Sequence, residues 1–135
     1  MFKRLLKNER GLTLIELLAV VVILGIISAI AVPSIGGLID NTKKDAHIAN
    51  AQQMVNAARL AYASDSTVTS YTLKDLISNG YLEPLEKPGG GKYDEDNSVV
   101  KLDGKIWRVT LKTGNKVHFE NEDPYKLPRS KVTLD

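Results

Sequence analysis

The longest apolar stretch of the chain lies near its N-terminus and predicts a membrane-spanning helix. In Leu12–Ile35, a run of 24 residues, the polar side chains are Thr13, Glu16, Ser28 and Ser34. An α-helix of that length extends for about 36 Å, which exceeds a hydrocarbon core of about 30 Å. A secretory signal has a shorter apolar core, and a buried helix of this length would be unusual in so small a domain. We therefore expect residues 12–35 to cross a membrane.

A second helical pattern follows and indicates contact with a sheet. Five apolar side chains at spacings of three and four form one stripe: Ile48, Ala51, Val55, Ala58 and Tyr62. Such a stripe is typical of a helix with one buried face. Before it, Pro33 and Gly36-Gly37 predict a kink or a loosened turn, because proline lacks an amide hydrogen and glycine weakens a helix. The pattern predicts one long, interrupted helix from Leu12 to Ala63.

The remaining residues carry signals for a short helix, a loop and a sheet. Thr72-Leu73-Lys74-Asp75 has the character of a capping box, and Asn79-Gly80 is a good helix end. Pro84, Pro88 and the glycine run that follows mark a loop.

Strand patterns occupy the last third of the chain. Asp103-Gly104, between Val99–Leu102 and Lys105–Leu111, is a strong hairpin signal, and Lys116–Glu120 predicts a further strand. Lys131–Leu134 is a less regular candidate for an edge strand. The fold class expected is α+β, with a long N-terminal helix packed on a three- or four-stranded antiparallel sheet.

Charge and composition refine this picture. The net charge of the 135-residue chain is +2, but residues 1–10 contribute +3 and the rest about −1. The basic residues before the apolar run are expected to stay cytoplasmic, which places the C-terminal domain outside. The chain has no cysteine, so a disulfide, a thiol nucleophile and a cysteine-based zinc site are excluded. Residues 121–135 must therefore be held by hydrogen bonds, hydrophobic contacts or an ion.

Glu16 is not explained by hydropathy. A carboxylate inside a membrane costs about 2.5–3.5 kcal/mol and usually has a partner, unless it lies shallow enough to reach the interface. Cleavage after Gly11 would create an α-amine at Leu12, four residues before Glu16. That amine would pair with Glu16 within one helix or with Glu16 of an adjacent copy, where the pair would also set the axial register.

The segment around these residues resembles a family signature. Lys7-Asn8-Glu9-Arg10-Gly11-Leu12-Thr13-Leu14-Ile15-Glu16-Leu17-Leu18 is similar to the class III signal of type IV prepilins and of the pseudopilins of type II secretion and competence systems. The resemblance implies that Gly11 precedes the scissile bond, that Leu12 becomes the N-methylated first residue, and that Glu16 and Pro33 serve assembly. The family usually has phenylalanine where this chain has Leu12, and leucine is a tolerated variant.

The resemblance also implies an organisation and a set of partners. Residues 1–11 would be a cleaved leader, residues 12–35 the transmembrane and filament-core helix, and residues 36–135 an extracytoplasmic pilin-like domain. Expected partners are other copies in a homo-oligomeric filament, a prepilin peptidase/N-methyltransferase, minor pilins, an assembly ATPase and an inner-membrane platform protein. The chain would lie in the cell membrane, N-in and C-out, before assembly and in a cell-surface filament afterwards.

Three functions remain open at this point. The first is a structural subunit of a type IV or competence pilus, with a role in adhesion, motility or DNA uptake. The second is a pseudopilin of a type II secretion system. The third, from another class, is a single-pass anchored binding module. No nucleophile-elbow or triad signature is present, so we expect no catalytic site and no cofactor.

Two weaker site hypotheses accompany this interpretation. Asp94, Glu95, Asp96 and Asn97 offer oxygen ligands of the kind that calcium accepts, although the EF-hand spacing is absent and a charged surface loop is the commoner explanation. Basic residues on or beside the predicted hairpins would contact DNA phosphates if they shared one face: Lys101, Lys105, Arg108, Lys112 and Lys116. The alternative is a solvent-facing set of strand positions. His47 and His118 are far apart in the sequence, and His118 is expected to face solvent between Val117 and Phe119.

Overall fold

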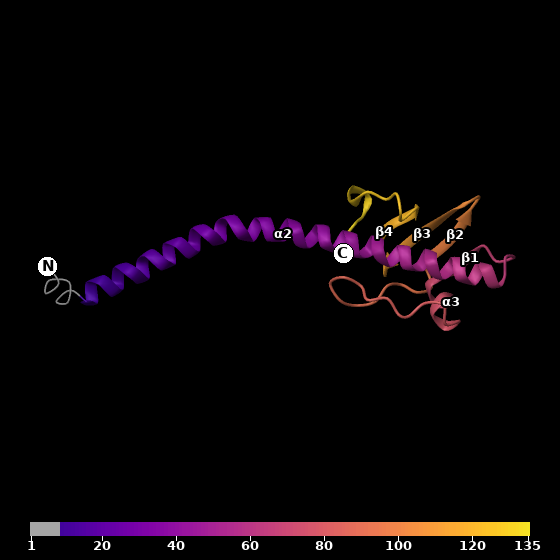
Figure 1. The fold of residues 1–135 in the computed structure, drawn as a ribbon, viewed down its shortest axis with the longest axis horizontal. Helices are drawn as coiled ribbons and strands as arrows, with labels where there is room; N and C mark the ends of the chain where they lie inside the picture. Colours follow the sequence, from indigo (N-terminus) through magenta and orange to yellow (C-terminus); the bar gives the residue numbers. More distant parts are fainter. Residues whose placement is uncertain (1–8) are drawn as a thin grey trace. The chain divides into compact units, whose positions relative to one another are not determined.

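The structure is a computed structural model that describes residues 9–135, with side chains from Gly11 onward (Figure 1). The described chain forms two compact units, one extending to Ile39 and the other comprising Asp40–Asp135. Helix α2, Glu9–Ser64, contributes to both units. Most of the predicted leader, residues 1–11, falls on residues 1–8, which lie outside the described residues.

The predicted interruption of the long helix is wrong, because α2 continues through Pro33, Gly36 and Gly37. Proline removes one backbone hydrogen bond, but the flanking turns keep theirs, and one missing bond in a helix of 56 residues does not end it. The Ser34 hydroxyl, next to the proline, donates to the Ile30 carbonyl at 3.1 Å. Its hydrogen bond is therefore made within the helix itself.

The C-terminal part of α2 carries the predicted apolar stripe, and its burial is confirmed. Ala51, Val55 and Ala58 are completely buried, and Met54 beside them is buried as well. Ile48 and Tyr62 pack at the margins of the same core. This core is built between α2 and one face of the sheet, so the helix is amphipathic only where the chain itself supplies a partner.

The sheet has four antiparallel strands in the order β1-β2-β3-β4, which confirms the expected α+β class. Its strands are β1 Ser70–Thr72, β2 Val99–Asp103, β3 Ile106–Thr113 and β4 Lys116–Glu122. Gly104 and Gly114 turn the two hairpins with positive φ values of 61° and 55°. Trp107, Val109 and Leu111 alternate onto the buried face as predicted.

The prediction of an edge strand at Lys131–Leu134 is wrong. The fourth strand is β1, while Arg129–Lys131 forms the 3₁₀ turn η1 and residues 132–135 are not in a strand. Pro124 and Pro128 have no amide hydrogen and cannot donate to a strand ladder, so the chain approaches β4 irregularly. One backbone bond joins this segment to β4, from the Thr133 N–H to the His118 carbonyl at 2.8 Å.

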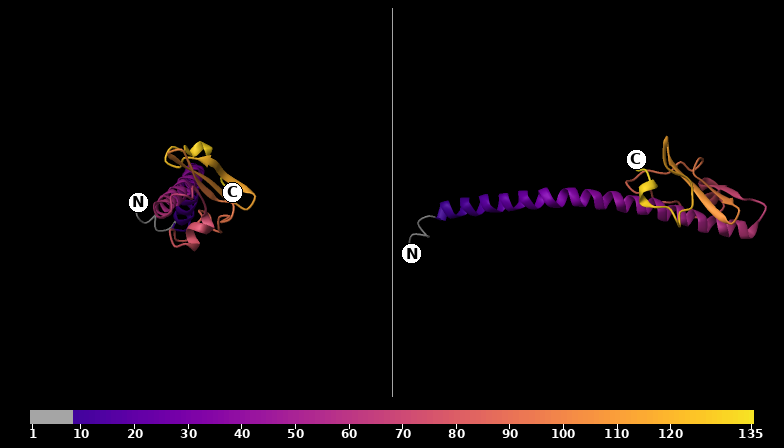
Figure 2. Two further views of the ribbon diagram at one scale, coloured as in Figure 1. Left: turned by 90° about the vertical axis from the view of Figure 1, so that its right-hand side faces the viewer. Right: turned by 90° about the horizontal axis from the view of Figure 1, so that it is seen from above.

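Helix α3, Leu73–Ser78, begins with the predicted capping box and ends at Asn79. The Thr72 hydroxyl accepts from the Asp75 N–H at 3.0 Å, and the Asp75 carboxylate accepts from the Thr72 N–H at 3.3 Å. Within the second unit, the sheet and the segment from α3 to residue 98 lie on different sides of α2 (Figures 1 and 2). The C-terminal segment returns beside the sheet, where it covers the end of β4.

Candidate assembly helix and buried polar network

The N-terminal part of α2 presents an uncovered apolar surface. Its large hydrophobic side chains between Leu12 and Ile39 are 37% to 68% exposed, and its most apolar 18-residue window has a mean hydropathy of 2.9 with none of it buried. Soluble monomers rarely expose contiguous apolar patches above a few hundred Å². By length and composition this helix can cross a membrane. This surface is suited to contact with lipid or with other protein.

The residues assigned to processing and assembly lie within this exposed segment. Gly11, Leu12 and Glu16 are all exposed on α2, and Leu12 and Glu16 are four residues apart. Positions i and i+4 of a helix share one face, so an amine at Leu12 would lie one turn from the Glu16 carboxylate. Pro33 is exposed in the same helix. The cleavage and the charge pairing themselves remain predictions.

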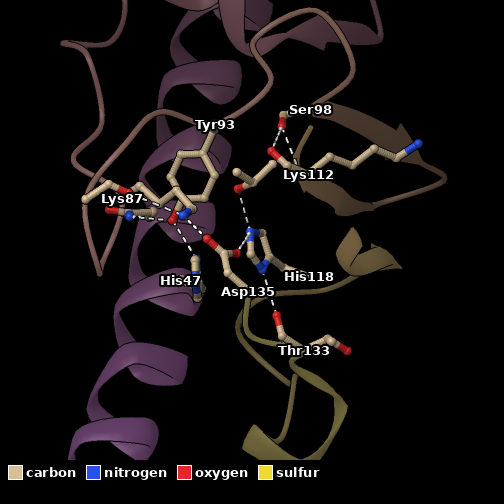
Figure 3. A network of polar contacts seen from close by, with 11 residues as sticks. His47, Lys87, Tyr93, Ser98, Lys112, His118, Thr133 and Asp135 are labelled. Carbon is tan, nitrogen blue, oxygen red and sulfur yellow. Dashed lines mark hydrogen bonds and ion pairs between the residues drawn. The ribbon is translucent and has the colours of Figure 1, made fainter. Parts of the chain in front are cut away.

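The second unit contains a buried polar network that sequence reasoning missed (Figure 3). The imidazole rings of His47 on α2 and His118 on β4 stack with their centroids 4.1 Å apart and their planes at 25°. His47 is 1% exposed and His118 is fully buried. The prediction that His118 faces solvent is wrong.

A β-bulge accounts for the inward position of His118. Leu111 pairs with Phe119 and the next residue of β3, Lys112, pairs with Val117. His118 is thus the extra residue of β4 between these two pairs, and a bulge of this kind redirects the side chain that it carries. Strict alternation therefore fails here, and both His118 and Phe119 are buried. Alternation in a single strand gives no sign of a register shift against its neighbour.

The hydrogen bonds of the two rings define their neutral forms. His118 Nδ1 lies 2.7 Å from the Thr133 carbonyl oxygen, which can only accept, so this nitrogen carries the proton. Its Nε2 then accepts from the Thr113 hydroxyl at 2.7 Å. His47 Nδ1 lies 2.7 Å from the Tyr93 hydroxyl, and Asn50 Nδ2 donates to that same hydroxyl at 2.9 Å. The Asn50 bond uses one lone pair of the Tyr93 oxygen and leaves the Tyr93 proton available to His47 Nδ1.

An ion pair at the exposed edge of the network completes it. Lys87, whose side chain is only 6% exposed, binds the carboxylate of Asp135, whose side chain is 44% exposed. The other carboxylate oxygen of Asp135 lies 3.3 Å from His118 Nε2, as Figure 3 shows. A buried ammonium group needs further hydrogen bonds, and Lys87 also donates to the Gly90 carbonyl at 3.3 Å.

Burial controls the proton affinity of this network. It lowers the pKa of His47 to about 4, and the neighbouring His118 and Lys87 act in the same direction. Burial also lowers the pKa of His118; the Thr133 carbonyl opposes this shift, and Lys87 and Lys116 add to it. Burial raises the pKa of Tyr93 to about 12, although its hydrogen bond from Asn50 works against the rise. At neutral pH both imidazoles and the phenol are therefore uncharged.

Side-chain contacts fasten the C-terminal segment to α2. Arg129 makes a two-pronged ion pair with Asp45, with both N–O distances at 2.7 Å. Tyr125 donates to Asn56 at 3.0 Å and lies under the Arg59 guanidinium, 5.5 Å from its carbon to the ring centre. The Gln52 amide donates to the Pro124 carbonyl at 3.2 Å. Hydrogen bonds and ion pairs thus hold the C-terminal segment against α2 in a chain that has no disulfide.

In the acidic loop considered as a calcium site, the first residue, Asp94, forms hydrogen bonds within the loop itself. The Asp94 carboxylate accepts from the backbone N–H groups of Asp96 and Asn97 at 3.2 Å and from the Asn97 amide at 2.7 Å, and these bonds lower its pKa. Asp96 faces Lys74 at 3.6 Å, and Glu95 is half-buried. Across residues 9–135, no three His, Cys, Asp or Glu side chains gather closely enough to hold a metal ion.

The basic residues considered for DNA binding are partly engaged. Lys101 lies opposite Arg108 on adjacent strands. Arg108 is half-buried, forms an ion pair with Asp103 at 3.2 Å and donates to the Asn121 carbonyl at 3.3 Å. Its charge is therefore offset by a neighbour on the same hairpin. Contact with DNA remains a prediction.

Comparisons with known proteins address the N-terminal segment and the chain as a whole. Residues 6–32 match the family model described as the prokaryotic N-terminal methylation motif. The type II secretion system core protein G of Escherichia coli (strain K12) is 25% identical over 103 residues, which cover 74% of this chain and 68% of that protein. No solved structure matches the chain.

Proposed function

We propose that the chain, which carries the prokaryotic N-terminal methylation motif at residues 6–32 and is similar to a type II secretion core protein, is a structural, non-catalytic subunit of a type IV pilin-like filament assembled through its N-terminal helix. The observation that carries this proposal is the uncovered apolar surface of α2 between Leu12 and Ile39, directly after the motif's glycine. Such a surface is compatible with lipid before assembly and with other copies of the same helix afterwards.

The proposed mechanism is a sequence of physical steps. The basic leader holds the N-terminus in the cytoplasm, and a prepilin peptidase cuts between Gly11 and Leu12. The new amine at Leu12 is then neutralised by Glu16, either in the same helix or in the adjacent copy. An unpaired charge in a low-dielectric setting is costly, so a pair formed between adjacent copies would favour the stagger that brings amine and carboxylate together. An assembly ATPase and a membrane platform would drive extrusion.

The type of filament divides this proposal in two. A type II secretion pseudopilus is favoured by the similarity to protein G of that system. A pilus that serves adhesion, motility or DNA uptake is the second form. Secretion of exoproteins should fail in a deletion strain only in the first case, and electron microscopy should show long surface filaments on wild-type cells only in the second.

Mass spectrometry of the protein from cells tests the processing step that both forms share. We expect a mature chain that begins at Leu12 and carries one additional methyl group. Gly11→Val, which places a branched side chain next to the scissile bond, should leave the N-terminus at Met1. A wild-type chain that still begins at Met1 in cells with an active peptidase would contradict the proposal.

Substitution of Glu16 tests the assembly step separately. Glu16→Leu should preserve or improve membrane insertion and greatly reduce filament yield, because the amine at Leu12 loses its partner. Glu16→Gln is the matched control, since it keeps the size and polarity of the side chain but removes the charge. Filaments of normal yield and order from either variant would show that the carboxylate has no role in assembly.

A further inference from the structure

The ion pair between Lys87 and Asp135 joins two segments that are far apart in the sequence. Lys87 lies in the loop that follows α3, and Asp135 lies 48 positions later in the C-terminal segment. The Lys87 Nζ atom is in direct contact with Oδ2 of the Asp135 carboxylate (Figure 3). An amine and a carboxyl group are the two groups that join into an amide when water is lost. The contact therefore brings together both reactants of such a condensation.

The surroundings of Lys87 disfavour a charged ammonium group. Its side chain is only 6% exposed, and it donates to the Gly90 carbonyl at 3.3 Å. An ion removed from water is costly unless its lost hydrogen bonds are fully replaced. Transfer of one proton from Lys87 to the carboxylate removes both charges at once. It leaves an uncharged amine, which is the form of lysine that acts as a nucleophile.

The His118 ring supplies a base beside the carboxyl group. Its Nε2 atom lies 3.3 Å from Oδ1 of Asp135. Both atoms are acceptors when His118 is neutral and Asp135 is ionised, so they attract each other only when a proton lies between them. The Thr113 hydroxyl, 2.7 Å from Nε2, fits either state of this nitrogen, because a hydroxyl group both donates and accepts. His118 is thus placed to hold a proton for Oδ1.

We propose that Lys87 and Asp135 condense into an isopeptide bond, an amide that links the two side chains. Lys87 first gives one proton to the carboxyl group, and its uncharged Nζ attacks Cγ of Asp135, so that the C–N bond forms. The second proton lost by Nζ passes to Oδ1, with His118 Nε2 as the base that relays it. Oδ1 then leaves as water when its bond to Cγ breaks. No oxidant or co-reactant is consumed, because water is the only other product.

Proximity favours this bond over the separate groups. In dilute solution an amine and a carboxylate stay uncondensed, but groups held in reacting geometry behave as if present at about 10⁵–10⁸ M. The released water has an exit, since the Asp135 side chain is 44% exposed and lines a pocket of about 310 Å³ together with Pro88 and Gly89. The bond would hold the C-terminal segment covalently in a chain that has no cysteine.

The mass of the full-length chain, purified in detergent and then unfolded, tests the proposal. We expect the wild-type protein to be lighter by one water molecule than its residues and its N-terminal processing require. After digestion with trypsin, which does not cut between Lys87 and Pro88, one branched peptide should join residues 75–92 to residues 132–135. A wild-type chain of full mass, with these two peptides separate after prolonged incubation at neutral pH, would overturn the proposal whether or not any variant folds.

Lys87→Arg is the matched control for the covalent bond. Arginine keeps the positive charge next to Asp135, but its guanidinium group stays protonated and does not act as a nucleophilic amine. Both this variant and Asp135→Ala should therefore have the full mass. A chain that is still lighter by one water in either variant would place the loss elsewhere and contradict the proposal.

The rate of cross-linking tests the part played by His118. In freshly translated chain, His118→Gln should slow the appearance of the branched peptide about 10²-fold or more, the contribution of a single general base, while Trp107 fluorescence stays native. Appearance of the peptide at the wild-type rate, or loss of the native fluorescence, would overturn the role of His118 as the base.

Discussion

The N-terminal and C-terminal parts of α2 differ in whether the chain itself covers their apolar side chains. Between Leu12 and Ile39 the large hydrophobic residues are exposed all around the helix, whereas Ala51, Val55 and Ala58 are completely buried by the chain itself. Each exposed Leu, Ile or Val retains about 1.5–3 kcal/mol that burial would release. One part of the helix has therefore already used its hydrophobic free energy to fold a domain, and the other keeps it for lipid or neighbouring subunits.

Equivalent leucine truncations in the two parts should give the largest contrast. Leu111→Ala removes a fully buried side chain and should lower the free energy of unfolding of the domain by about 2–5 kcal/mol, because it leaves a cavity. Leu24→Ala removes a side chain that is 56% exposed and should leave that free energy unchanged. Denaturant unfolding in detergent, followed by Trp107 fluorescence, measures both. Equal losses would mean that the N-terminal segment contributes to the domain core.

Acidification should have the next largest effect. It should lower the stability of the unit Asp40–Asp135, which contains both histidines. Because the folded state lowers the pKa of His47 to about 4 from 6.5, it binds fewer protons than the unfolded state between these values. The corresponding stability is fully present above pH 6.5 and is lost as the pH falls towards 4. We expect a decrease of about 2–3 kcal/mol. The measurement is denaturant unfolding across this range. The control is the double variant His47→Gln/His118→Gln, which removes both histidines of the chain and whose stability should fall less steeply with pH.

Removal of a hydroxyl group should distinguish the two parts more finely. Thr72→Ala deletes the cap of α3 and should cost about 1 kcal/mol of domain stability. Ser34→Ala deletes a hydroxyl that bonds only to the Ile30 carbonyl within its own helix and should not change domain unfolding. The midpoint of thermal unfolding, measured by circular dichroism in the same detergent, compares the two. A shift caused by Ser34→Ala would indicate that the first unit supports the second.

The smallest expected effect is a gain in the stability of the domain. Asn121 has a φ of 51°, a left-handed conformation that glycine adopts without strain. Asn121→Gly should raise the domain's free energy of unfolding by about 0.5 kcal/mol, since the relief of strain exceeds the added chain entropy. Asn115→Gly, at an exposed turn position where no positive φ is found, is the control and should not stabilise.

Patterns confined to one segment were predictable from the sequence. The stripe on α2 repeats every three to four residues, and the Thr72 capping box and the Asp103-Gly104 hairpin each depend on residues close together in the sequence, so local geometry determines them. The family signature around Gly11 and Glu16 is likewise local, and the methylation motif confirms it.

Features that depend on register between distant segments were not predictable. The pairing of His118 with His47 requires a bulge in β4, which arises from how Leu111 and Lys112 meet the opposite strand. The edge position of β1 depends on Tyr71 lying opposite Val100, although a three-residue strand leaves almost no period to detect. The Asp45–Arg129 ion pair joins residues 84 positions apart, and neither side chain differs from any other surface charge in the sequence.

The fastening of the C-terminal segment has a consequence for production and folding. Arg129, Tyr125 and Lys87 hold it through contacts that form as soon as the chain reaches its native shape, with no thiol to oxidise. Folding of this domain thus requires neither an oxidoreductase nor an electron acceptor. It should mature equally well in a reducing and in an oxidising compartment, and dithiothreitol should leave its unfolding curve unchanged.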